Sequence, residues 1–139
     1  MMSNRVHVST GSPWEPVVGY SRAIRVGNVV EVAGTTAMKD GKVIAVGNAY
    51  EQTKYIIQSI EQVLEQVLEQ VGATLSDVVR TRMFVTDISA WEDIGRAHGE
   101  YFNTIRPVAT MVEVKALIEP DLLVEIEVQA IVDQDRLRG

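Results

Sequence analysis

The chain has 139 residues, of which 46% are hydrophobic and 23% are charged, and this balance is ordinary for one globular domain. Its formal net charge of −6 opposes binding to nucleic acid, because affinity for nucleic acid comes mostly from clustered Lys and Arg. The chain has no cysteine, which excludes a disulfide framework, a thiolate nucleophile and a Cys-ligated metal. We expect no nucleic-acid partner, no metal and no other cofactor.

The N-terminal stretch has no pattern that predicts a targeting signal. The first residues, MMSNRVHVSTGSPW, lack the apolar segment of a signal peptide, and no later run approaches the roughly 18 apolar residues of a membrane span. A cytoplasmic protein without membrane contact is therefore expected. Residues 1–16 are polar and contain Gly11, Pro13 and Pro16, which favours an extended N-terminal arm or loop over a helix. His7 lies in this arm, and we interpret it as a surface histidine, because a metal site needs several converging ligands.

Turn signals divide the next part of the chain. Residues 17–33 contain two β-prone runs joined by Gly27-Asn28, which predicts a hairpin. Gly34 follows directly, and a glycine at a strand end often marks a tight bend or a close backbone approach. Asp40-Gly41 predicts a second, small hairpin.

A helix is predicted over residues 49–72, because apolar residues recur there at helical spacing and Gly72 is a natural C-cap. The tetrapeptide EQVL occurs twice within it, at residues 61–64 and 65–68. A four-residue repeat exceeds the helical period, so its apolar stripe drifts by about 40° per copy. The second copy either lengthens the helix by one turn or extrudes a turn into the loop. In either case we expect little effect on a site built from strands.

The spacing of apolar residues next predicts a strand over residues 78–88 and a second helix over residues 90–104. The helical stripe runs from Trp91 to Phe102 and includes His98. A lone imidazole without an identified orienting partner is weak evidence for catalysis, so we interpret His98 as structural.

Two final strands are predicted from alternation, with apolar residues in one parity over 112–116 and again over 124–130. Pro120-Asp121 lies between them and predicts a hairpin turn. Glu125 and Glu127 point the same way from the last strand, and two unpaired carboxylates are costly to bury. This face of the strand is therefore either exposed to water or part of a functional site.

The whole chain, residues 1–139, is interpreted as a single α+β domain with an antiparallel or mixed sheet and both helices on one face. It resembles the Rid family of reactive-intermediate deaminases, also called the YjgF-type family, in the stretches GYSRAIRVGNVVEVAG, VGATLSDVVRTRMFVTDI, RPVATMVEV and PDLLVEIEVQAI. The similarity runs from about Tyr20 to Val132. It implies a chorismate-mutase-like fold and a homotrimer whose sheets surround a central axis, with small-molecule pockets at the subunit interfaces.

The resemblance also implies site residues. Deaminases of this family hydrolyse enamines or imines, and in them an arginine in a Pro-x-Arg-Ser motif binds the substrate carboxylate. That motif corresponds here to Pro107-Val108-Ala109-Thr110, so the arginine position holds Ala109. The pocket tyrosine, the glycine after the second strand and the glutamate of the last strand correspond to Tyr20, Gly34 and Glu125.

We therefore take Glu125 as the candidate general base. The predicted substrate-binding residues are Tyr20, Gly34, Ala109, Thr110 and Arg106. Thr110 would offer a hydroxyl and a backbone amide at the pocket mouth. An asparagine that some family members carry on the second helix falls near Gly95.

Ala109 argues against deamination of amino-acid-derived imines, because a lost charge-assisted hydrogen bond costs about 1.5–3 kcal/mol. Arg106 and Arg82 are candidates to replace the missing guanidinium. Two functions stay open. The first is hydrolysis of an imine, an enamine or a related C–N bond in an intersubunit cleft. The alternative is a non-catalytic homotrimer that binds a metabolite or regulates a partner.

Overall fold

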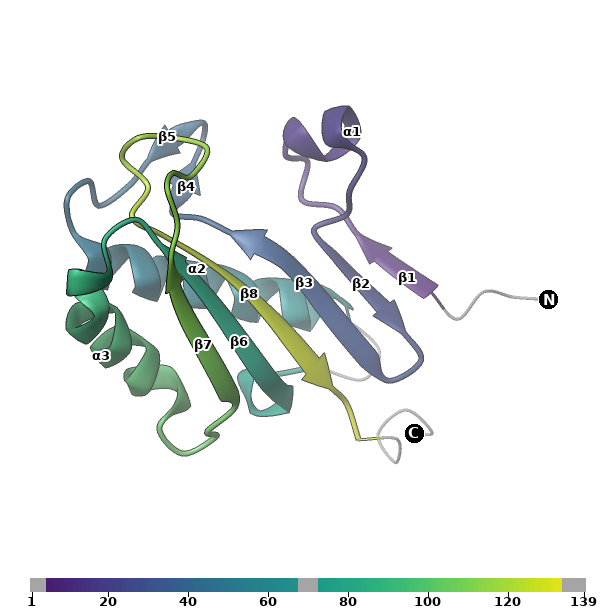
Figure 1. The fold of residues 1–139 in the computed structure, drawn as a ribbon. Helices are drawn as coiled ribbons and strands as arrows, with labels where there is room; N and C mark the ends of the chain where they lie inside the picture. The colour runs from purple at the N-terminus through teal and green to yellow at the C-terminus, as the bar shows by residue number, and fades with distance from the viewer. Residues whose placement is uncertain (1–4, 68–72, 134–139) are drawn as a thin grey trace.

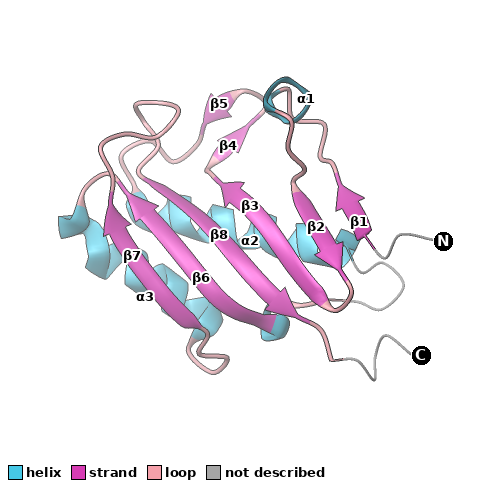
Figure 2. Cartoon of the chain, turned by 45° about the vertical axis from the view of Figure 1, so that its right-hand side comes forward, coloured by secondary structure: helices cyan, strands magenta, loops and turns pink. Residues whose placement is uncertain are grey.

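The computed structural model describes residues 5–67 and 73–133. Six strands form one sheet in the order β1-β2-β3-β8-β6-β7, and a separate pair, β4 and β5, forms a small hairpin (Figure 1). Helices α2 and α3 lie side by side against one face of the sheet (Figure 2). The elements are β1 (Arg5–Val8), α1 (Trp14–Val18), β2 (Ala23–Val26), β3 (Val29–Thr35), β4 (Met38–Lys39), β5 (Lys42–Val43), α2 (Ala49–Val67), β6 (Val78–Val85), α3 (Trp91–Phe102), β7 (Val108–Glu113) and β8 (Val124–Ile131), with short 3-10 turns at Leu75–Asp77 and Ile88–Ala90.

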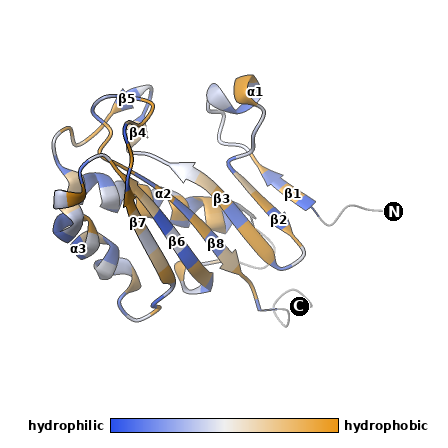
Figure 3. Ribbon diagram, in the orientation of Figure 1, coloured by the Kyte–Doolittle hydropathy of each residue, from blue (hydrophilic) through white to orange (hydrophobic). Residues whose placement is uncertain are grey.

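This architecture confirms the α+β prediction. The β2–β3 hairpin turns at Gly27, which has a φ of 62°, and the β4–β5 hairpin turns at Asp40 and Gly41, both with positive φ. All five strand pairings in the large sheet are antiparallel except that of β6 with β7. Figure 3 shows hydrophobic and hydrophilic residues alternating along central strands such as β6.

The expected hairpin between the last two strands is wrong. β6 lies between β7 and β8, pairing in parallel with β7 and antiparallel with β8. The connection of residues 114–123 is long enough to pass the end of β6, and backbone hydrogen bonds from Val114 N to Val85 O and from Thr86 N to Leu123 O hold it there. The chain therefore reverses direction near Asp121, as expected, but the strands before and after this turn, β7 and β8, do not pair with each other.

The N-terminal arm is also more ordered than expected. β1 pairs with β2, and Pro16 lies inside the short helix α1. Proline is tolerated in a first helical turn, because the N–H groups there have no intrahelical partner. The helix ends at Gly19, which has a φ of 90°, and its Glu15 side chain is buried.

The core fills the space between the sheet and the two long helices. The first EQVL copy buries Val63 and Leu64, and the helix continues into the second copy through Val67. Leu68 and the expected cap Gly72 lie outside the described residues. Trp91 was expected on the apolar stripe of α3 but is 55% exposed. The largest fully buried side chains are Ile56, Ile57, Ile60, Leu64, Ile94, Leu122, Ile126, Gln52, Val30, Val85 and Val124.

His98 is partly buried on the side of α3 that faces β6, and it has a hydrogen-bond partner that the sequence did not indicate. It is hydrogen-bonded through Nε2 to Thr81 Oγ1 at 2.9 Å, and its ring centroid lies 4.6 Å from that of Phe102. Burial lowers its pKa, which favours the neutral imidazole at neutral pH. His98 thus links α3 to β6.

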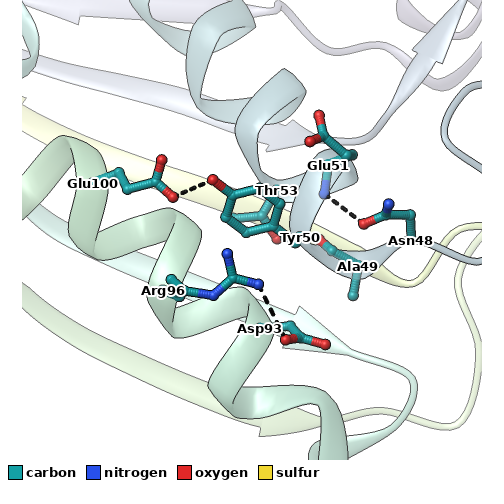
Figure 4. A network of polar contacts seen from close by, with 8 residues as sticks. All are labelled: Asn48, Ala49, Tyr50, Glu51, Thr53, Asp93, Arg96 and Glu100. Carbon is teal, nitrogen blue, oxygen red and sulfur yellow. Dashed lines mark hydrogen bonds and ion pairs between the residues drawn. The ribbon is translucent and has the colours of Figure 1, made fainter.

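An exposed polar cluster joins α2 to α3 (Figure 4). Tyr50 donates its hydroxyl hydrogen bond to Glu100, and the Arg96 guanidinium lies over the Tyr50 ring, 4.0 Å from its centroid. Arg96 also pairs with Asp93 at 3.4 Å. The cluster thus links the two helices on their solvent-exposed side.

Gln52 is a buried polar side chain that joins α2 to the segment before β8. Its Nε2 donates to the backbone oxygen of Asp121 at 3.0 Å, and its Oε1 accepts from the backbone N–H of Leu123 at 2.9 Å. We expect Gln52→Leu to lower the free energy of unfolding by about 2–5 kcal/mol, because each buried polar group left without a partner costs about 1–3 kcal/mol. Urea unfolding measures this loss. Gln58→Leu is the control, since Gln58 bonds an exposed tyrosine hydroxyl; equal losses would contradict the interpretation.

Candidate functional site

Glu125 lies on the sheet face opposite the core side chains of β8. Its neighbours Val124 and Ile126 are buried under the helices, so the alternation of the strand turns the Glu125 side chain away from them. The carboxylate packs against the backbone of Gly34, at a register shift between β3 and β8. A Cβ added to Gly34 would overlap Oε2 of Glu125 and lie 2.9 Å from its Cδ. The close approach expected at this glycine is therefore made by the glutamate side chain.

A hollow of about 670 Å³ adjoins this carboxylate. We call it the Glu125 hollow. Segments far apart in the sequence surround it: the turn before α1, the end of β3, the β4–β5 hairpin and the second half of α2. Its lining residues are Thr10, Gly11, Ser12, Pro13, Trp14, Val18, Tyr20, Arg22, Gly34, Thr35, Thr36, Met38, Asp40, Gly41, Ser59, Gln62, Val63, Gln66, Ile118 and Glu125.

Among the described residues that line this hollow, Arg22 is the one cation, and the sequence analysis did not single it out. Its Nη1 donates to the Gly34 backbone oxygen at 2.9 Å and to Thr35 Oγ1 at 3.2 Å. Its Nη2 donates to the Tyr20 hydroxyl at 3.3 Å. The sequence held one indication that Arg22 lies beside the predicted site residue Tyr20. The two residues are two positions apart, and such residues share one side of an extended chain.

The electrostatic surroundings raise the pKa of Glu125. Burial is the main cause, and the nearby Glu127 carboxylate adds to it, while the Arg22 guanidinium partly opposes both. A carboxylate with a raised pKa is a stronger base than an exposed one. It can take a proton from water and return it to a leaving group near neutral pH.

This raised pKa predicts a pH-dependent stability. The folded state favours protonated Glu125. The contribution of this group to the free energy of unfolding is therefore complete below the pKa of an unfolded Glu, about 4.3. It is lost as the pH rises through the higher folded-state pKa. We expect neutral Glu125→Gln to unfold at a higher Tm than the parent at about pH 7 and at a similar Tm at about pH 4. Thermal unfolding at both pH values measures the difference. Glu127→Gln is the control, and an equal gain in that variant would show that the effect is only one of net charge.

Comparison with known proteins identifies the family of this chain. The family described as Endoribonuclease L-PSP matches residues 10–132. The chain belongs to this family, which is also known as the YjgF or Rid family. The expected family resemblance is thus confirmed.

Relatives of the chain share most of its length. Rv2704 of Mycobacterium tuberculosis, whose crystal structure is described as that of a YjgF/YER057c/UK114 family member, is 52% identical with a TM-score of 0.81, covering 92% of this chain and 99% of that one. The uncharacterized protein SCO2049 of Streptomyces coelicolor is 37% identical over 88% of this chain and 89% of its own length. A RutC family protein of Pyrococcus abyssi is 35% identical over 81% of this chain and 86% of its own.

Three of the predicted Rid-family residues, Tyr20, Gly34 and Glu125, meet at the Glu125 hollow. Ala109 and Thr110 do not join them within one chain. They lie exposed on the edge strand β7, which β6 separates from the strand of Glu125. Along β6, Ala109 pairs with Thr81, whereas Glu125 pairs with Phe84, so the two residues also lie at different heights in the sheet.

Neither arginine proposed to replace the Rid-family arginine lines the Glu125 hollow. Arg106 is exposed, and its Nε donates to the backbone oxygen of Asn103 at 2.9 Å, at the end of α3. Arg82 pairs with Glu127 at 3.2 Å.

A second hollow, of about 650 Å³, lies on the sheet face. We call it the sheet-face hollow; Arg82 and Glu127 line it, as does His7, which is hydrogen-bonded to Ser21 Oγ at 2.9 Å. Tyr20 lines both hollows. No group of three or more His, Asp or Glu side chains suited to a metal ion occurs within residues 5–67 and 73–133. No helix in the same ranges is long and apolar enough to cross a membrane.

Proposed function

We propose that the protein is a hydrolase that cleaves the C–N bond of a small imine or enamine in the Glu125 hollow. The observation that carries this proposal is the half-buried Glu125 carboxylate, whose pKa is raised and which opens onto a hollow of about 670 Å³. Such a volume is in the range of small-molecule sites.

The proposed reaction needs one water and one group that moves protons. Glu125 takes a proton from the water, whose oxygen then bonds to the imine carbon. Protonated Glu125 gives this proton to the nitrogen, so that a carbinolamine forms. Glu125 then takes the proton of the carbinolamine hydroxyl and passes it to the nitrogen, so that the C–N bond breaks, the C=O bond forms and ammonia leaves. An imine and water thus give a carbonyl compound and ammonia, with no oxidant or reductant. An enamine reaches the same intermediate after protonation on carbon.

We further propose that the chain works as a homotrimer, with a hollow at each of three interfaces. Two features support this proposal. The edge strand β7 exposes the apolar side chains of Val108 and Val112, and unpaired edge strands are usually covered. The face of the sheet opposite α2 and α3 is left uncovered by helices within one chain (Figure 2). Sedimentation of the purified protein tests the stoichiometry.

The test of the function is ammonia release from freshly generated imines. Each imine is produced in the assay by an amine oxidase, which gives neutral imines, or by an amino-acid oxidase or a pyridoxal-phosphate lyase, and its decay is followed with and without the protein. Faster ammonia release that is proportional to protein concentration supports the proposal. No acceleration with any imine, together with saturable ligand binding, would favour the non-catalytic metabolite-binding alternative.

A further inference from the structure

We infer that the EQVL repeat of α2 forms part of the ligand site, and that Gln62 and Gln66 bind an uncharged polar group at the far end of an elongated substrate. This inference rests on the proposed function, because it takes Glu125 as the reacting end of the same hollow. The repeat was expected to have little effect on a site built from strands. Its two copies nevertheless each contribute a glutamine to the lining of the Glu125 hollow.

The Glu125 hollow extends from one face of the sheet to the other. Glu125 lies on the face opposite the helices, between the buried residues of β8. Gln62, Val63 and Gln66 belong to α2, which packs against the other face (Figure 2). The wall between them includes residues 34–36, at and just after the end of β3, so the hollow passes around the end of that strand. Its volume of about 670 Å³ lies in the range that holds drug-sized ligands. The hollow therefore has room for a substrate whose reacting end and tail lie on the two faces.

The repeat presents its glutamines to the hollow. Gln62 and Gln66 hold the same position in the first and second copies, and residues four apart lie on the same side of a helix. Glu61 and Glu65, one position earlier in each copy, do not line the hollow. The second half of α2 thus offers amides instead of charges to a ligand, and the group that matches it is uncharged.

The two amide groups are available for a ligand. Both side chains are exposed, and neither Gln62 nor Gln66 has a hydrogen-bond partner among the described residues. Ser59 lies on the same side of α2, but its hydroxyl already donates to the backbone oxygen of Tyr55 at 3.0 Å. A glutamine amide has both N–H donors and a C=O acceptor. A carboxamide has the same two kinds of group and can pair with it in both directions, so a carboxamide is the tail group that we expect.

The test compares two ketones of nearly equal shape, 6-oxoheptanamide and 7-methyloctan-2-one. Both carry a carbonyl group like that of the proposed product, and they differ only in whether the chain ends in a carboxamide or in an isopropyl group. Their dissociation constants are measured by NMR titration for the parent, for the double variant Gln62→Leu/Gln66→Leu and for Gln58→Leu. We expect the double variant to lose about tenfold of the parental preference for the carboxamide, the effect of two neutral hydrogen bonds.

Two controls make this result specific. Gln58→Leu should keep the parental preference, because Gln58 lies on α2 outside the hollow and donates to the Tyr101 hydroxyl. A shorter pair of ketones, 4-oxopentanamide and 5-methylhexan-2-one, tests the length of the substrate. Their tails do not reach α2 from Glu125, so their ratio of dissociation constants should be the same in the parent and in the double variant. An equal loss with the shorter pair, or in Gln58→Leu, would overturn the inference.

This design separates the inference from folding and from the proposed function. The preference is a ratio within each variant, so partial unfolding does not change it. Loss of the preference in the double variant supports the tail site even if no imine is hydrolysed, a result that would overturn only the proposed function. An unchanged preference in the double variant, or a parent that binds neither long ketone, would overturn the inference and leave the hydrolase proposal standing.

Discussion

Glu125→Gln is expected to lower kcat for imine hydrolysis by about 10²–10⁴-fold, the usual contribution of a general base. Gln keeps the size of the side chain but cannot take a proton from water. The parent rate should fall at low pH as Glu125 becomes protonated, from a pH above that of an ordinary Glu, because burial raises its pKa. The residual rate of Glu125→Gln should lose this pH dependence. Steady-state ammonia release between about pH 4 and 8 measures both effects.

Glu127→Gln is the matched control, because Glu127 lies on the same face of β8 but pairs with Arg82 in the sheet-face hollow. Its kcat should stay within a few-fold of the parent. Equal rates in Glu125→Gln and the parent would show that Glu125 is not the base.

Gly34→Ala is expected to lower kcat/KM by about 100-fold, because a displacement of about 1 Å in a catalytic group has an effect of this size. The added methyl would overlap the Glu125 carboxylate, and the flexible side chain would swing out of its position. The free energy of unfolding should fall by about 1–3 kcal/mol, as for other overpacked sites. Activity and urea unfolding are measured on the same preparation.

Two comparisons make this prediction specific. In a Glu125→Ala background the stability cost of Gly34→Ala should disappear, because the clashing group is gone; a cost that persists would place the strain in the backbone. Gly95→Ala is the second comparison, since a Cβ there meets nothing within 4 Å and lies in α3. That variant should gain about 0.5–1 kcal/mol of stability and keep its activity.

Local patterns in the sequence predicted much of the fold. Gly27 and the Asp40-Gly41 pair occur at turns that require positive φ, so the hairpins could be predicted from single dipeptides. The alternation around Glu125 correctly predicted which side chains of β8 face the core. Such signals depend on neighbours within a few residues.

Features that depend on distant segments were missed. The path of residues 114–123 past β6 is fixed by contacts with that strand, so Asp121 alone could not reveal it. Arg22 was overlooked because its hydrogen bonds reach Gly34 and Thr35, which lie at the end of another strand. The Rid-family motif drew attention to Ala109 instead, although the hollow assembled within one chain lies elsewhere.

A crystal structure of the protein grown with 2-oxobutyrate, the product of one proposed reaction, tests the account most directly. The ligand is expected in the Glu125 hollow, with its carbonyl carbon about 3–3.5 Å from a water held by Glu125. A ligand bound beside Ala109 or in the sheet-face hollow, with Glu125 free of contact, would contradict the account.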